Sequence, residues 1–336
     1  MTWFILELVA MLFVILAGSE LFTNALEHLG QKLKISDGVT GSVFAAVGTA
    51  LPETMVPLLA LFAGTNNVSL NEEIGVGSIL GAPLMLSTLT TCLMALAILP
   101  RRGLVGYVSP ERTGFVRDLN FFLFAFGLAA AAMYVPYEAR YIRGALSAAL
   151  VLTYFIYIML TLRASEQLVE DGHGTEAEEK MFLSKIGLPT NLPTIFLQLG
   201  VGLGLLVLGA KGFISGMEGV SHLLGVSALL LSLLIIPIAT ELPEKVNSIL
   251  WVRRDKDTLA FGNITGAMVF QGTLLPAIGI MLTPWQPRIE VMSGILITLI
   301  AAAWLRINSR SQGLPIWALL VNGAFYVTFL VITLKR

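Results

Sequence analysis

The residues best suited to chemistry lie in a five-residue pattern, Thr-x-Leu-Pro-Glu, that occurs twice. It runs from Thr49 to Glu53 and from Thr240 to Glu244, each time inside an apolar stretch. Proline removes a backbone N–H and clashes with the carbonyl one turn earlier, so the carbonyls before it lose their helical partners. With a threonine hydroxyl and a carboxylate, these carbonyls form a set of hard oxygen ligands that suits Ca²⁺ or Na⁺.

The free-energy cost of placing these two glutamates inside membrane helices indicates that they have a function. An acidic residue at the centre of a membrane helix costs roughly 2.5–3.5 kcal/mol on insertion scales. The alternative is that the prolines are ordinary kinks and the glutamates are only tolerated. That alternative requires the same cost at two equivalent positions, so we expect Glu53 and Glu244 to be functional.

Composition indicates a helical membrane protein. Of the 336 residues, 56% are hydrophobic and only 13% are charged, with a mean hydropathy of +0.81. Apolar runs long enough to cross a bilayer recur along the chain, beginning with MTWFILELVAMLF, which we interpret as a first span. The lone Cys92 excludes an internal disulfide framework, and no Cys/His cluster suggests zinc or iron–sulfur. We expect no cofactor and no nucleic-acid partner.

Hydropathy predicts ten spans, five before and five after a hydrophilic segment at 164–190. The predicted organisation is a first five-helix half at 1–163, a linker loop at 164–190 and a second five-helix half at 191–336. The expected spans are 2–30, 36–64, 72–99, 117–135, 142–163, 193–222, 226–252, 258–283, 289–306 and 314–334.

The two halves are copies of one another. The segment from Gly18 to Glu53 aligns without a gap with the segment from Gly209 to Glu244. Since five spans per copy is an odd number, the second copy must insert upside down. The predicted fold is therefore all-α and polytopic, with ten transmembrane helices in two inverted five-helix repeats. Secondary transporters have this architecture, with a site at the midplane between the copies.

Loop charges predict the orientation. Lys and Arg concentrate in the loops on the side that contains 164–190. The positive-inside rule therefore places this loop in the cytoplasm and both termini outside. We expect a multi-pass protein of the cell membrane, either a plasma membrane or a bacterial inner membrane.

A glycine-rich stretch follows each motif, at 75–81 and at 262–266. Gly and Ala at spacings of four allow helices to pack closely, which we expect to be the main role of both stretches. Ser78, Asn263 and Gln271 lie in or near them and could direct polar groups at the site.

Two charged residues of the second motif have no counterpart in the first. Glu241 and Lys245 stand where the first copy has Ala50 and Thr54. Their spacing of four, with the glutamate first, favours a helical ion pair, although Pro243 lies between them. The two opposite charges could simply neutralise each other. Glu241 could instead be an extra ligand or a proton carrier. A third possibility is that the Lys245 ammonium occupies the space of a sodium ion.

GTALPE and ATELPE, each followed by a G-x-x-x-G stretch, resemble the α-repeats of the Ca²⁺/cation antiporter superfamily, and the prokaryotic Na⁺/Ca²⁺ exchangers in particular. The resemblance implies ten helices in two inverted repeats, with long, tilted first and sixth helices. It also implies ion ligands from both motifs. These would be the side chains of Glu53, Glu244, Thr49 and Thr240, with backbone carbonyls near Ala46 and Pro237.

The chain departs from the superfamily pattern at several ligand positions. The pattern Gly-Thr-Ser-Leu-Pro-Glu has Ala50 and Glu241 in place of its serine. In the later Gly-Ser-Asn-x-x-Asn/Asp pattern, the residues that differ are Ala82, Pro83, Leu86, Ala267, Met268 and Gln271. Several oxygen ligands of the superfamily's sodium sites are therefore missing, which leaves the coupling ion, the stoichiometry and the transported ion open.

The function expected from these patterns is secondary antiport, by alternating access, of Ca²⁺ or a similar cation against Na⁺ or H⁺. A divergent exchanger of other specificity, or a cation channel or sensor, is the alternative. An intramembrane enzyme acting on a lipid phosphate is more remote, because the midplane offers Lys245 but no Arg or His. The expected partners are inorganic cations and the bilayer, and the sequence leaves the oligomeric state open while being compatible with a monomer.

Overall fold

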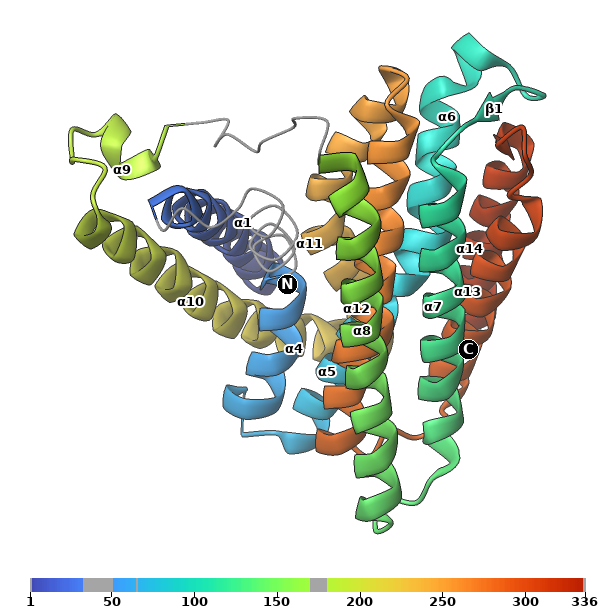
Figure 1. The fold of residues 1–336 in the computed structure, drawn as a ribbon. Helices are drawn as coiled ribbons and strands as arrows, with labels where there is room; N and C mark the ends of the chain where they lie inside the picture. Colours follow the sequence, from blue (N-terminus) through green and yellow to red (C-terminus); the bar gives the residue numbers. More distant parts are fainter. Residues whose placement is uncertain (1, 33–50, 65, 170–179, 335–336) are drawn as a thin grey trace. The chain divides into compact units, whose positions relative to one another are not determined.

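The computed structural model describes residues 2–32, 51–64, 66–169 and 180–334, and nearly all of them are helical (Figure 1). Two short strands, β1 (Tyr107–Val108) and β2 (Leu314–Pro315), pair antiparallel. The helices are α1 (Thr2–Lys32), α4 (Leu51–Ala63), α5 (Val68–Met85), the π-helical turn η2 (Leu86–Thr90), α6 (Thr91–Arg102), α7 (Arg112–Ala131), the 3₁₀ turn η3 (Ala132–Tyr134), α8 (Arg140–Val169), α9 (Phe182–Lys185), α10 (Leu192–Leu224), α11 (Ala228–Arg253), α12 (Asp257–Leu282), α13 (Ile289–Asn308) and α14 (Ile316–Leu334).

Eight helical stretches in the described part of the chain are long and apolar enough to cross a membrane. They are Trp3–Leu26, Val68–Arg102, Arg112–Tyr134, Arg140–Thr161, Leu192–Leu224, Asp257–Leu282, Ile289–Asn308 and Ile316–Leu334. The other two expected spans, 36–64 and 226–252, overlap α4 and α11. Residues 36–50 lie outside the described residues, and within α11 the apolar stretch found among the described residues is Ala228–Ile238, which is shorter than a span. The total of ten therefore stays a prediction, as do the inverted repeats.

The chain folds into two compact units, each drawn from both halves of the sequence. One comprises Met1–Asn71 with Ile158–Val226, and the other comprises Glu72–Tyr157 with Ser227–Arg336. The predicted division into 1–163, 164–190 and 191–336 follows sequence order and not spatial contacts. It stays a prediction.

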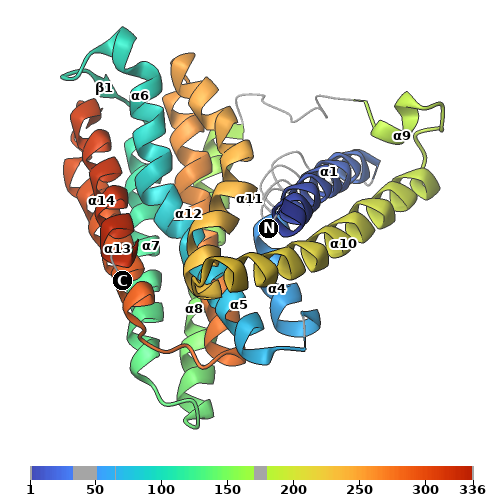
Figure 2. The same cartoon turned by 180° about the vertical axis from the view of Figure 1, so that it is seen from behind.

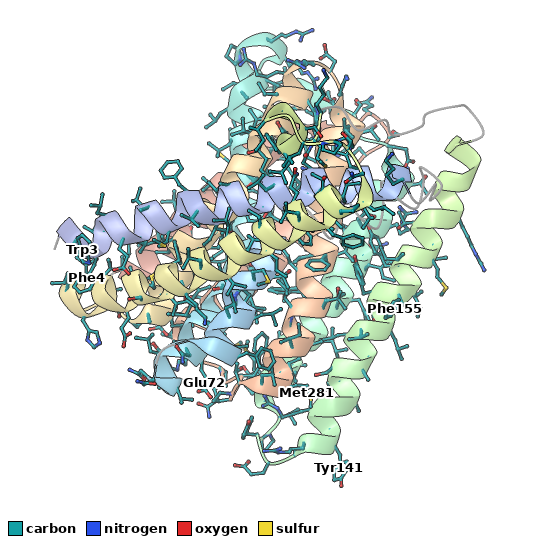
Figure 3. The ribbon with its side chains drawn as sticks, turned by 90° about the vertical axis from the view of Figure 1, so that its left-hand side faces the viewer. Trp3, Phe4, Glu72, Tyr141, Phe155 and Met281 are labelled. Carbon is teal, nitrogen blue, oxygen red and sulfur yellow. The ribbon has the colours of Figure 1, made fainter. Side chains whose placement is uncertain are left out.

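In the first unit, the long helices α1 and α10 run side by side over much of their length (Figure 3). Glycines set the distance between them. A Cβ on Gly18 would come 2.9 Å from the backbone nitrogen of Leu206, and one on Gly202 would come 2.8 Å from that of Phe22. Because two backbones in direct contact leave no room for side chains, α1 and α10 form one tightly packed pair.

In the second unit, α5 and α6 join through η2 into one continuous helical stretch. Pro83 lies inside α5, and Ser87 Oγ donates to the carbonyl of Pro83 at 2.8 Å. The π turn then follows, and Nδ2 of Asn322 from α14 donates to the carbonyl of Ser87 at 2.7 Å. The Ser87 hydroxyl and the Asn322 amide thus donate to backbone carbonyls around the proline and the π turn, and the helix continues through both.

Helices α12 and α7 pack together at the centre of the second unit, beside α13 and α14 (Figure 2). Arg143 of α8 caps the end of α12: it is 2% exposed, and its guanidinium donates to the carbonyls of Ile280, Thr283 and Pro284. A cation at a helix C-terminus satisfies carbonyls that have no helical partner. Tyr141 of the same helix points outward and is 96% exposed, as suits a lipid-facing surface (Figure 3).

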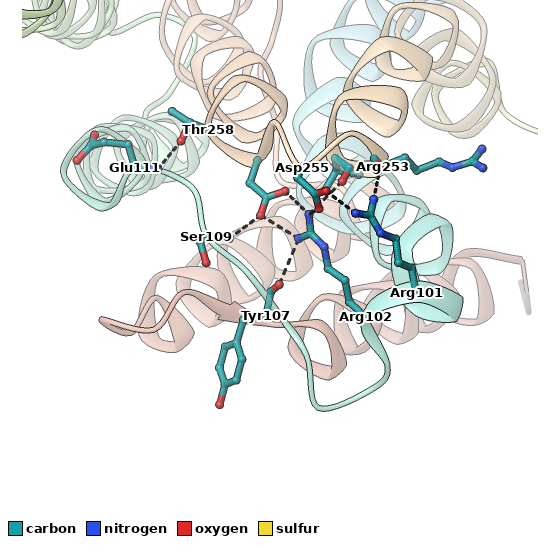
Figure 4. Close-up of polar contacts among 10 residues, drawn as sticks. Arg101, Arg102, Tyr107, Ser109, Glu111, Arg253, Asp255 and Thr258 are labelled. Atoms are coloured by element: carbon teal, nitrogen blue, oxygen red, sulfur yellow. Dashed lines mark hydrogen bonds and ion pairs between the residues drawn. The ribbon is translucent and has the colours of Figure 1, made fainter.

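An arginine clasp, defined here as Arg101 and Arg102 with Asp255 and Asp257, closes one end of the second unit (Figure 4). Arg101 lies 2.6 Å from a carboxylate oxygen of Asp255, and Arg102 lies 2.7 Å from Asp255 and 2.8 Å from Asp257. Asp255 has a left-handed backbone, with φ of 61°. The clasp ties the end of α6 to the turn that joins α11 to α12.

Candidate functional site

The second motif lies in α11, which begins after Ser227 and continues past Pro237 to Arg253. Oγ of Ser227 caps the helix by accepting from the backbone nitrogen of Leu230 at 3.2 Å. Because Pro237 has no N–H, the carbonyl of Leu233 lacks its helical donor. A Cβ added to Gly81 of α5 would lie 2.4 Å from this carbonyl and 2.7 Å from Cγ of Pro237. The backbone oxygen released by Pro237 therefore lies against α5.

Glu241 is fully buried in α11 and contacts two polar partners. Nζ of Lys245 lies 3.5 Å from Glu241 Oε2, and both side chains are almost fully buried. From α12, Nε2 of Gln271 donates a hydrogen bond to Glu241 Oε1. Gln271 is itself only 2% exposed. These three side chains form the polar core between α11 and α12, which we call the Glu241 cluster.

The Glu241 cluster retains one acceptor that no described donor satisfies. Gln271 Oε1 is buried and accepts no hydrogen bond from a described residue, whereas Glu241 Oε2 faces the Lys245 ammonium at the ion-pair distance of 3.5 Å. Thr240, next in the chain, is 1% exposed and donates its hydroxyl proton to the carbonyl of Ile236 at 3.0 Å. Its oxygen lone pairs therefore remain available to a cation. Buried oxygens without donors are costly unless a ligand or water meets them.

The two glycine stretches differ in what surrounds them. A Cβ on Gly77 would come 1.8 Å from Oγ of Ser232, and Gly81 is equally crowded by α11, so close packing is confirmed for 75–81. A Cβ on Gly262 would meet none of the described atoms within 4 Å, and one on Gly266 would meet only the hydroxyl of Tyr157, at 3.7 Å. Close packing of 262–266 therefore stays a prediction, because no described backbone of another element comes within 4 Å of a Cβ on these two glycines and residues 33–50 lie outside the described part of the chain.

Two predicted polar residues bond elsewhere. Ser78 is buried, and its hydroxyl donates to the carbonyl of Ile74 at 2.6 Å, within its own helix. Asn263 donates to Oγ of Ser248 at 2.9 Å. It precedes Gln271 by eight residues, which is about 12 Å along a helix. The described hydrogen bonds thus join Gln271 to Glu241 but leave Asn263 and Ser78 outside the cluster.

The central predicted ligands are only partly placed. Glu53 belongs to α4 and Glu244 to α11, but their side chains lie outside what the structure describes. Thr49 and Ala46 also lie outside the described residues. Within the described part of the chain, no three His, Cys, Asp or Glu side chains gather as a metal cluster. The ligand roles of these residues remain predictions.

The sequence reasoning missed one buried acid, Asp118 of α7. It is 5% exposed, and its Oδ2 accepts from the hydroxyl of Thr265 on α12 at 2.7 Å. Nε of Arg117 lies 3.6 Å from Oδ1. The available signal was an aspartate inside a helix that continues as an apolar run. The expected span 117–135 begins at this pair, so hydropathy alone places Asp118 at the end of a helix.

Comparison with known proteins identifies the family. A family model described as "Sodium/calcium exchanger protein" matches residues 3–163 and 194–335. The chain is 24% identical over 298 residues to inner membrane protein YrbG of Escherichia coli, covering 86% of this chain and 84% of that protein. It is also 24% identical over 365 residues to the sodium/calcium exchanger MaX1 of Methanosarcina acetivorans, covering 98% of this chain and 97% of the relative.

Solved structures share the fold at low sequence identity. The H⁺/Ca²⁺ exchanger CAX aligns with a TM-score of 0.71 at 18% identity, covering 98% of this chain and 82% of that one. The sodium–calcium exchanger NCX_Mj aligns with a TM-score of 0.55, also at 18% identity, covering 98% and 97%. The matching family consists of membrane ion exchangers and not of enzymes. The chain belongs to the sodium/calcium exchanger family, within the Ca²⁺/cation antiporter superfamily.

Proposed function

We propose that the protein is a secondary antiporter that exchanges Ca²⁺ for Na⁺ or H⁺ by alternating access. One observation carries this proposal: the family match spans both copies of the Thr-x-Leu-Pro-Glu motif. The names of relatives support the ions, since MaX1 is a sodium/calcium exchanger and CAX an H⁺/Ca²⁺ exchanger.

The proposed site takes one carboxylate from each motif. Glu53 and Glu244 would be the ligands that bind both the transported and the coupling ion. The hydroxyls of Thr49 and Thr240 and the carbonyls near Ala46 and Pro237 complete the set. The carbonyl of Leu233, released by Pro237, and the buried oxygen of Thr240 support the second half of this site.

Competition for the same carboxylates explains the exchange. One divalent ion, or several monovalent ions or protons, must neutralise the glutamates before the occupied site can change the side to which it opens. Bare carboxylates exposed to an apolar surface would make that step too costly. The carrier therefore moves with one kind of ion or the other, and it stays fixed when empty.

The proposed setting is the cell membrane, crossed ten times by two inverted five-helix repeats. The basic loops place both termini outside and the 164–190 loop in the cytoplasm. The described helices support the membrane setting because eight of them are long and apolar enough to span it.

Flux into proteoliposomes tests the proposal. Purified protein is reconstituted, and ⁴⁵Ca²⁺ uptake is measured under an outward Na⁺ gradient, an outward H⁺ gradient and no gradient. Antiport predicts uptake that requires one of the two gradients. Uptake without any counter-ion gradient would instead indicate a channel, and absence of uptake in all three conditions would remove Ca²⁺ exchange as the function.

A further inference from the structure

Lys245 is a positively charged residue buried in α11, the helix that contains the second Thr-x-Leu-Pro-Glu motif. The Lys245 side chain is 3% exposed, and its ammonium lies 3.5 Å from the fully buried carboxylate of Glu241. A buried ammonium is strongly disfavoured unless a negative charge compensates it. The ammonium therefore supplies, from the chain itself, a positive charge that neutralises Glu241.

The pair is confined to one of the two copies of the motif. The corresponding residues of the first copy are Ala50 and Thr54, which carry no charge. Each copy is therefore neutral at these two positions, the first because it has no charges there and the second because its two charges oppose each other. Replacing only one of the two residues would leave a single charge buried in the helix.

The Glu241 carboxylate contacts one amide and one positive charge, as a carboxylate that binds a cation would. The Gln271 amide holds one carboxylate oxygen, and the ammonium lies at ion-pair distance from the other. Gln271 Oε1 is buried beside them and accepts no hydrogen bond from a described residue. A monovalent cation among these oxygens would need the same acceptors, one carboxylate and one amide carbonyl.

We propose that Lys245 is a tethered cation, which takes the place of one monovalent ion beside Glu241. This inference rests on the proposed antiport function and adds to it the number of ions required. With the ammonium in place, Glu241 needs no ion from solution, so the loaded carrier binds one monovalent cation fewer than a carrier with a free carboxylate there. Lys245 is thus a specificity-determining residue for the coupling ion.

Ion-dependent stability tests this without relying on transport. The melting temperature of the purified protein is measured while Na⁺ or K⁺ replaces N-methyl-D-glucamine at constant ionic strength. Lys245→Met leaves Glu241 without its cation and should acquire an additional Na⁺- or K⁺-dependent rise of about 5 °C at saturation. The Glu241→Gln/Lys245→Met double variant has no charge to neutralise and should respond like the wild type. Lys211→Met, which removes an exposed lysine of α10, is the matched control and should also respond like the wild type.

An unchanged cation response in Lys245→Met would overturn the proposal, as would an additional response that persists in the double variant. If Lys245→Met does not fold, Glu241→Gln decides, because it leaves the ammonium unpaired beside the site. Its Ca²⁺-induced stabilisation should then require about tenfold more Ca²⁺, with recovery in the double variant. An unaltered Ca²⁺ response would equally overturn the proposal. Failure of the antiport function would be seen separately, as absence of wild-type flux.

Discussion

Gln271 of α12 donates a hydrogen bond to the buried carboxylate of Glu241 in α11. This contact joins α12 to the proline motif of the second copy, and it makes Gln271 the described residue that ties the two helices together at the motif. Hydrogen bonds to charged groups are stronger than those between neutral groups. The contact is therefore expected to matter for stability as well as for the position of Glu241.

Replacing Gln271 by Leu should destabilise the protein by about 1–3 kcal/mol, because Glu241 Oε1 would lose its donor in a buried setting. The matched control is Asn263→Leu, which removes a hydrogen bond between two neutral groups on the same helix pair. We expect the control to cost only about 0.5–1.5 kcal/mol. Denaturant unfolding in detergent measures both, and a smaller loss for Gln271→Leu than for the control would contradict the assignment.

The paired glycines of the two copies should respond in opposite directions to alanine. Gly77→Ala would place a methyl group 1.8 Å from Ser232 Oγ and 2.7 Å from the backbone oxygen of Leu229. The hydroxyl can rotate away but the backbone cannot, so α5 and α11 must separate. We expect loss of folded protein or a destabilisation of about 1–3 kcal/mol. Gly262→Ala meets no described atom and should stabilise α12 by about 0.5–1 kcal/mol through helix propensity. Equal effects of the two substitutions on the melting temperature would contradict the structural difference between the copies.

The two arginines of the clasp should contribute unequally. The Arg102 side chain is 15% exposed and contacts both aspartates, whereas the Arg101 side chain is 64% exposed. Arg102→Met should therefore cost about 1–3 kcal/mol, and Arg101→Met about 0–1 kcal/mol. High salt should reduce the Arg101 effect more than the Arg102 effect. A larger loss in Arg101→Met would show that the clasp is not organised around Arg102.

Stability should fall in acid partly through Asp255. Hydrogen bonds from Arg102, and then from Arg101, hold the pKa of this carboxyl below its ordinary value. The stabilisation is therefore complete above the pKa of the unfolded chain, and it is lost as the pH falls through the lower pKa of the folded protein. The melting temperature should drop on acidification from about pH 6 to about pH 3 by more in the wild type than in Asp255→Asn. Parallel curves for the two proteins would contradict the linkage.

Apolar runs made most of the fold predictable, because long helices in a bilayer follow directly from hydropathy. The first and sixth expected spans correspond to α1 and α10, within a few residues at each end. The i,i+4 spacing also anticipated the contact between Glu241 and Lys245, since α11 remains helical past Pro243. The local sequence pattern was therefore sufficient to predict a contact between two residues of the same helix.

Contacts between helices were not predictable from the same patterns. The hydrogen bond from Gln271 depends on how α12 is rotated against α11, which no spacing reveals. The sequence symmetry suggested equal roles for Gly77 and Gly262, but among the described residues only Gly77 lies against another helix. Arg102 is one of the basic loop residues that predict the orientation, and its pairing with Asp257 in the structure does not follow from that pattern.

Glutamate substitutions in the flux assay test the central claim most directly. ⁴⁵Ca²⁺ uptake into proteoliposomes is compared for wild type, Glu53→Gln and Glu244→Gln under the gradient that drives the wild type, with equal amounts of folded protein. Glu290→Gln, in the first turn of α13 and outside both motifs, is the matched control. Loss of uptake in both motif variants, with normal uptake in the control, is the predicted result. Wild-type uptake in both motif variants would contradict the shared-carboxylate site.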